Sequence, residues 1–181
     1  MDKVVNSRKH KLALNAAIAL CYFAFGVNYN LLGNTVTDFN NITGIDQAQF
    51  SYVFMLRSGI YCLGAIFLEG AWLPNFFNRQ LLFGFNMLLL GVSMCLTPFF
   101  PRFEYILTNQ AVVGFASGGI DIATNVLIME MWEENSNTFL QATHLCYAIG
   151  STASPMIAAP FLLDTKVYTN KTSNNGTLPE S

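Results

Sequence analysis

An aspartate and an asparagine stand four residues apart in a long apolar stretch of the sequence. Asp121 and Asn125 belong to the segment Gly-Gly-Ile-Asp-Ile-Ala-Thr-Asn, residues 118–125. Residues at this spacing share one face of a helix. A carboxylate at the centre of a membrane-spanning helix costs about 2.5–3.5 kcal/mol on insertion scales, which favours a functional role. We interpret Asp121 as a substrate or cation ligand, or a proton carrier, with Asn125 as its hydrogen-bonding partner. The alternative is a structural carboxylate that holds neighbouring helices together.

A second polar stripe consists of His144, Tyr147, Ser151 and Ser154, which are three, four and three residues apart. This spacing places their side chains on one face of a helix that is otherwise apolar. Imidazole and hydroxyl groups next to the Asp121 face indicate a cavity that binds a solute. The alternative for His144 is a buried structural histidine.

Two further polar features interrupt apolar stretches. Arg57 lies about seven residues inside the predicted helix 50–70, roughly 10 Å deep at 1.5 Å per residue. Asp121 is deeper, so a direct salt bridge between the two is not expected. Arg57 either extends outward to water or faces the cavity, where a planar guanidinium suits a hydroxyl-rich or carboxylate ligand. Asn28 and Asn30 form a weaker feature, and amide groups suit the hydroxyls of a sugar.

The composition shows which elements position these residues. Of 181 residues, 52% are hydrophobic and 11% are charged, whereas soluble domains average about 25% charged residues. The net charge of −2 gives no electrostatic case for binding nucleic acid. Charges are missing or rare in several stretches of about 20 residues, the length that spans a bilayer. The sequence therefore predicts an all-α, polytopic membrane helix bundle with about five transmembrane helices, at residues 12–33, 50–70, 80–99, 104–129 and 139–163.

The charged and polar ends of the chain predict its orientation. Residues 1–11 carry four basic side chains, and the positive-inside rule places this tail in the cytoplasm. Alternation of the helices in the transmembrane bundle, 12–163, then puts the polar loop or tail 164–181 and the C-terminus outside the cell. Glycosylation occurs on that side only. All three N-x-S/T sequons fall in segments predicted to lie outside: Asn41, Asn170 and Asn175.

No enzymatic chemistry is visible in the sequence. It contains no P-loop, no Gly-x-Ser-x-Gly motif and no cluster with metal-ligand spacing. The four cysteines have no C-x-x-C spacing and all fall in predicted helices, where packing roles are expected. We therefore expect no catalytic residue, no metal site and no cofactor, and expect lipid and a small solute as partners.

Three segments resemble the amino-terminal half of transporters of the major facilitator superfamily. The most similar branch is that of the sodium-dependent glucose transporters, with a more distant similarity to fucose permeases. The segments are 77–82, 118–127 and 141–144, the last followed by Gly150 and Pro155. The resemblance covers about residues 12–163, and the segment 118–127 is its most specific part.

The resemblance implies glucose or other hexose uptake by alternating access in the plasma membrane, with sodium as the coupling ion. The residues that carry over are Asp121, Asn125 and His144. From the residues alone, the coupling ion is either sodium or a proton. Because such transporters have about twelve helices in two halves, we expect an N-terminal fragment that needs the C-terminal half, or a partner chain, for transport. The alternative is a non-transporting membrane protein or truncated product that acts only as an assembly partner.

Overall fold

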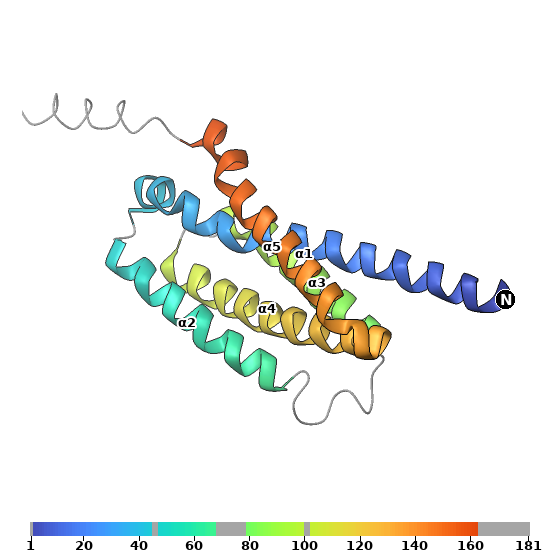
Figure 1. Cartoon of the computed structure of the whole chain (residues 1–181). Coiled ribbons are helices and arrows are strands. Elements are labelled where there is room, and N and C mark those ends of the chain that lie inside the picture. The colour runs from blue at the N-terminus through green and yellow to red at the C-terminus, as the bar shows by residue number, and fades with distance from the viewer. Residues whose placement is uncertain (1, 45–46, 68–78, 100–101, 163–181) are drawn as a thin grey trace, which may run out of the picture.

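The computed structural model describes residues 2–44, 47–67, 79–99 and 102–162 (Figure 1). These residues form five long α-helices and short 3-10 turns, with no strand among them. The helices are α1 (Asp2–Thr43), α2 (Gln47–Ala65), α3 (Arg79–Leu96), α4 (Phe103–Trp132) and α5 (Ser136–Ala158). The 3-10 turns are η3 (Thr97–Phe99), η4 (Glu133–Asn135) and η5 (Ala159–Phe161). The all-α fold class is confirmed.

Each predicted span overlaps one helix, but α1 extends well beyond its predicted bounds. It includes most of the predicted N-terminal tail, 1–11, and continues to Thr43, past the end of the predicted span at residue 33. A polar side chain there forms its hydrogen bond within the helix: the Thr35 hydroxyl donates to the carbonyl of Leu31 at 3.0 Å. The helix thus continues past the end of the predicted span at residue 33, because polar composition alone does not end a helix.

Three described helical stretches are long and apolar enough to cross a membrane: Arg8–Asp38, Arg79–Phe99 and Phe103–Phe161. The last of these contains both α4 and α5. The helix α2 is not among them, because Arg57 and other polar residues lower its mean hydropathy. The crossing of the bilayer by α2 therefore stays a prediction.

The bundle is built from two close helix pairs, α1 with α5 and α2 with α4. Glycines allow the close approach in both pairs. A Cβ atom on Gly26 of α1 would overlap the carbonyl oxygen of Tyr147 on α5, and one on Gly118 of α4 would overlap that of Tyr61 on α2. Small residues at such contacts are typical of helices that pack in membranes, where backbones must approach closely to gain van der Waals contact.

The remaining helix, α3, packs on α4 through both apolar and polar contacts. In the polar contact, the Asn109 amide donates to the Ser93 carbonyl and to the Thr97 hydroxyl, each at 2.9 Å. These three residues are buried, so the bonds satisfy groups that lipid cannot satisfy. The largest buried apolar cluster joins α1, α3 and α4, and includes Ile18, Tyr22, Phe25, Leu90, Val113 and Ile120.

Charged residues from three helices meet at one end of the bundle. Arg79, at the start of α3, forms an ion pair with Glu130, near the end of α4. Lys11 of α1 donates to the carbonyl of Met131 at 2.9 Å. Figure 1 shows the N-terminal part of α1 projecting past the other helices. Lys11, Arg79 and Glu130 are thus brought to a common end of the bundle.

Candidate functional site

A pocket of about 340 Å³ opens between α1, α2, α4 and α5. Its lining consists of Tyr22, Phe25, Tyr29, Tyr61, Asp121, His144 and Tyr147. We call it the aspartate pocket. Four of its seven lining residues are tyrosines, so phenolic hydroxyls and aromatic faces surround a single carboxylate.

The carboxylate of Asp121 is bound by two phenols from two other helices. Tyr22 of α1 donates to its Oδ1, and Tyr61 of α2 donates to its Oδ2 at 2.7 Å. Tyr22 is only 1% exposed, so its hydroxyl requires this partner. A carboxylate has about four acceptor positions. Asp121 therefore keeps the capacity to bind a donor or a cation that enters the pocket.

Among the described residues, the hydrogen-bonding partner of Asn125 is His144 and not Asp121. Nε2 of His144 on α5 donates to Oδ1 of Asn125 on α4 at 3.2 Å. The ring of His144 also meets that of Tyr22 edge-on, with centroids 5.5 Å apart. Asp121 and Asn125 are therefore connected indirectly, because Tyr22, which binds Asp121, packs against the ring of His144, which binds Asn125.

The predicted polar stripe on α5 is divided between two roles. His144 and Tyr147 line the aspartate pocket, where the ring of Tyr147 lies 5.3 Å from that of Phe25. Ser154 is buried and accepts a 3.1 Å hydrogen bond from the Asn34 amide, which connects α5 to α1. Of the four residues of the stripe, only His144 and Tyr147 therefore line the aspartate pocket.

Arg57 is buried, with 2% of its surface exposed. Its guanidinium carbon lies 3.6 Å from the ring centroid of Tyr29, and its Nη2 donates to the Tyr29 carbonyl at 2.7 Å. The outward-extended alternative is thus wrong, and the expected absence of a salt bridge to Asp121 agrees with these contacts. Arg57 lines a second pocket of about 240 Å³, together with Tyr29, Asn30, Gly33, Phe54 and Ser58. We call this the arginine pocket.

The two asparagines of α1 differ in position. The Asn28 amide donates to the Ala24 carbonyl at 2.9 Å, and Asn28 does not belong to the lining of the aspartate pocket. The Asn30 amide donates to the Gly26 carbonyl at 3.0 Å, and Asn30 lines the arginine pocket. The structure therefore brings Asn30, rather than Asn28, to a cavity.

Four residues of the aspartate pocket were missed by sequence reasoning. Tyr22, Phe25 and Tyr29 follow each other at spacings of three and four, which puts three aromatic rings on one face of α1. Tyr61 lies four residues after Arg57, on the same face of α2. An aromatic stripe at helical spacing was the signal for these positions, but it is equally typical of a packed core.

The glycosylation candidates are placed only in part. Asn41 lies within α1, whereas Asn170 and Asn175 lie outside the described residues.

In the described part of the chain, no group of three or more His, Cys, Asp or Glu residues is arranged to hold a metal ion.

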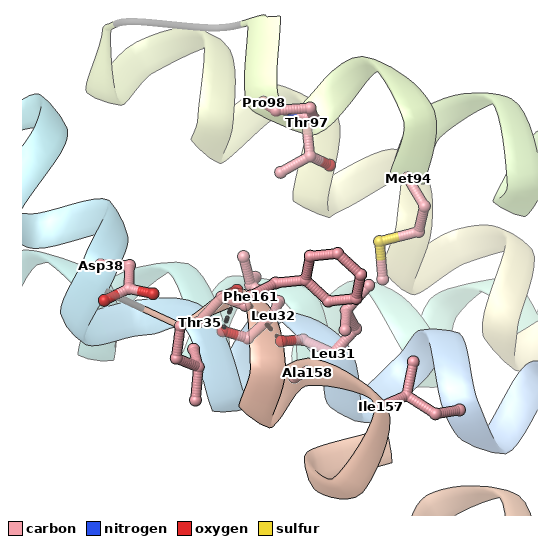
Figure 2. A pocket seen from close by; sticks show the side chains of 11 residues that line it. Leu31, Leu32, Thr35, Asp38, Met94, Thr97, Pro98, Ile157, Ala158 and Phe161 are labelled. Atoms are coloured by element: carbon pink, nitrogen blue, oxygen red, sulfur yellow. Dashed lines mark hydrogen bonds between the residues drawn. The ribbon is translucent and has the colours of Figure 1, made fainter. Parts of the chain in front are cut away.

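A larger pocket, of about 480 Å³, lies elsewhere, between α1, α3, η3, α5 and η5 (Figure 2). Figure 2 shows Phe161 and Leu32 near its centre, with Asp38 at one edge. Apart from Asp38, Thr35 and Thr97, its lining is apolar. The combination of a carboxylate, hydroxyls and exposed rings is instead found in the aspartate pocket, which is the better candidate for a solute site.

A helix bundle with a polar, carboxylate-containing pocket between its apolar helices is the arrangement of a membrane transporter. Residues 18–166 match the Major Facilitator Superfamily. The chain belongs to this superfamily and is a multi-pass membrane protein, in a family of transporters rather than enzymes.

Curated relatives include two kinds of proteins. Sodium-dependent glucose transporter 1 of Danio rerio is 33% identical over 144 residues, which are 78% of this chain and 24% of that protein. Human major facilitator superfamily domain-containing protein 4A is 31% identical over 160 residues, 84% of this chain and 30% of that protein. The chain thus spans about a third or less of the length of the curated relatives it matches. No solved structure matches the chain.

Proposed function

We propose that this chain forms the amino-terminal part of a plasma-membrane transporter and binds the substrate and the coupling ion. The proposed substrate is a hexose, most of all glucose, and the proposed coupling ion is sodium. The observation that carries the proposal is the position of Asp121 between two phenols in the aspartate pocket. The chain is also similar to proteins named sodium-dependent glucose transporter 1 from Danio rerio and Rattus norvegicus.

The lining of the aspartate pocket suits a hydroxylated solute. A sugar presents hydroxyls that both donate and accept hydrogen bonds, and C–H faces that pack on aromatic rings. Asp121 offers acceptors, the phenols and the His144 ring offer donors and acceptors, and Phe25 offers an apolar face. Few polar groups on an aromatic lining are typical of small-molecule sites.

The same carboxylate suits a coupling cation. Ionisable residues inside membrane proteins typically mark ion pathways, and Asp121 supplies a negative charge with phenolic oxygens close to it. A cation at Asp121 would compete with the two phenol donors. Because these donors come from α1 and α2, cation binding would change the contacts between helices, as a coupled conformational change requires.

Transport itself is proposed to need the C-terminal half of such a transporter, or a partner chain, because alternating access moves two halves around a central site. The chain alone is therefore expected to bind glucose without completing transport. In this proposal the N-terminus is cytoplasmic and the C-terminal segment is extracellular.

The test is equilibrium binding of radiolabelled glucose to the purified chain in lipid nanodiscs, in sodium or in choline buffer. We expect binding that is stronger in sodium, and loss of the sodium dependence in Asp121→Asn. The control is Glu104→Gln, which removes an exposed carboxylate from the same helix. The absence of glucose binding in sodium, as expected for a protein that is only an assembly partner, would overturn the proposal, as would sodium dependence unchanged in Asp121→Asn.

A further inference from the structure

Arg57 is a buried cation that lacks a protein counter-charge. In the described part of the chain no carboxylate pairs with it, and its Nε atom is buried without a hydrogen-bond partner. Its compensation comes from Tyr29, through the ring under the guanidinium and the carbonyl that accepts from Nη2. A buried charge without such an opposite charge is costly and calls for a further partner.

The chemistry of the guanidinium defines that partner. A guanidinium carries five N–H donors in a planar fork, which matches the two oxygens of a carboxylate. One of these donors has the Tyr29 carbonyl as its acceptor, and the Nε–H has none. The donors of this fork therefore suit an anionic group with two acceptor oxygens.

The arginine pocket provides room for such a group. Its volume of about 240 Å³ exceeds that of several water molecules at about 30 Å³ each. Its other polar side chains, Asn30 and Ser58, offer further hydrogen bonds, and its lining contains no acidic residue. An entering anion thus meets donors and no protein carboxylate.

The arginine pocket also adjoins the aspartate pocket. Tyr29 lines both, with its ring against the guanidinium of Arg57 on one side and 5.6 Å from the ring of Phe25 on the other. The two pockets therefore share one lining residue and are neighbours in the bundle.

We propose that the arginine pocket is a subsite for the carboxylate of a hydroxylated substrate, so that sugar acids bind better than neutral hexoses. This inference rests on the proposed function, because it places the sugar ring in the aspartate pocket. It narrows the substrate class to compounds with an anionic group at one end and hydroxyls at the other.

The test is competition on the chain in nanodiscs, in sodium buffer, between radiolabelled glucose and unlabelled glucuronate or glucose. Because a hydrogen bond to a charged group is stronger than a neutral one, we expect glucuronate to compete about tenfold better or more. Arg57→Gln should abolish this preference, and Arg57→Lys should retain only part of it, because lysine keeps the charge without the fork. Arg102→Gln, which removes an exposed arginine next to α4, is the control.

A second variant covers the case in which Arg57→Gln does not fold. Ser58→Asp adds a carboxylate to the lining of the arginine pocket at an exposed position, where its negative charge repels an entering anion. In this variant, glucuronate should no longer compete better than glucose. Equal competition by the two sugars in the unchanged protein, or a preference retained in Ser58→Asp, would overturn the inference and leave the proposed function intact. If the unchanged protein does not bind glucose at all, the proposed function is overturned. Direct binding of labelled glucuronate to the unchanged protein and to Arg57→Gln would then test the arginine pocket alone.

Discussion

The phenol of Tyr61 on α2 donates a 2.7 Å hydrogen bond to Oδ2 of Asp121 on α4, within one of the two close helix pairs. Tyr22 donates to the other oxygen from α1, which belongs to the second pair. The same carboxylate therefore strengthens one helix pair and also connects it to the other. Two chemically equal bonds thus have different structural consequences.

This difference predicts distinct effects of Tyr61→Phe and Tyr22→Phe. Each removes one phenol donor from a half-buried carboxylate, so each should lower the free energy of unfolding by about 1–2 kcal/mol. Tyr22→Phe should in addition widen the distance distribution between spin labels placed on α2 and α5, because it removes a bond between the pairs. Tyr52→Phe, at an exposed position of α2, is the control. Equal distance distributions in Tyr22→Phe and Tyr61→Phe would contradict this division of roles.

The hydrogen bond between His144 and Asn125 predicts the behaviour of Asn125→Leu. This change removes the acceptor that holds the imidazole, so glucose affinity should fall about twofold to tenfold. The sodium dependence of binding should remain, because the hydrogen bonds to both oxygens of Asp121 come from phenols and not from Asn125. Nanodisc binding in sodium and in choline measures both quantities. A loss of sodium dependence in Asn125→Leu would instead favour the direct partnership of Asp121 and Asn125 that the sequence suggests.

The helices could be predicted from the sequence, but the partner of Asp121 could not. Long apolar runs define helices because only helices satisfy the backbone in lipid. Spacing then tells which residues share a face, without telling which helix that face meets. Asn125 shares a face with Asp121 but lies one turn along α4, about 5–6 Å away, where it contacts α5 through His144. The phenols that bind Asp121 come from α1 and α2, far away in sequence.

Arg57 illustrates a second limit of sequence reasoning. Its depth in the predicted helix argued against a salt bridge with Asp121, and the structure gives Tyr29 as its partner instead. Whether an arginine extends to water or turns inward depends on the neighbouring helix, and here the ring and carbonyl of Tyr29 on α1 provide the inward partner. No spacing rule within α2 contains that information.

The sequons predict a selective pattern of glycosylation. Asn170 and Asn175 lie in the segment predicted to be extracellular, so they should carry glycans after expression in mammalian cells. Asn41 lies within α1, and because acceptor sites are typical of surface loops, it should remain unmodified. The shift in gel mobility after digestion with a glycosidase shows whether the chain carries glycans. The double substitution Asn170→Gln and Asn175→Gln should abolish the shift, and Asn41→Gln should not change it. An unmodified wild-type chain would contradict the predicted orientation.

Close packing at Gly118 predicts a large effect of a single methyl group. In Gly118→Ala the new Cβ would overlap the backbone carbonyl of Tyr61, and backbone cannot move aside as a flexible side chain can. The helices α2 and α4 must separate, which should lower the free energy of unfolding by about 1–3 kcal/mol. The separation should also move the Tyr61 phenol away from Asp121. Sodium-dependent glucose binding should therefore weaken together with the loss of stability.

The matched control for this packing effect is Gly91→Ala in α3. A Cβ atom at Gly91 meets no atom within 4 Å, so this change adds the same methyl group without a steric conflict. Alanine is favoured over glycine in a helix by about 0.5–1 kcal/mol, so Gly91→Ala should retain or slightly raise stability. Thermal unfolding in detergent, followed by circular dichroism, compares the two variants. If Gly118→Ala unfolds at the temperature of Gly91→Ala, then the two helices tolerate a wider separation, and the position of Tyr61 relative to Asp121 does not depend on the glycine contact.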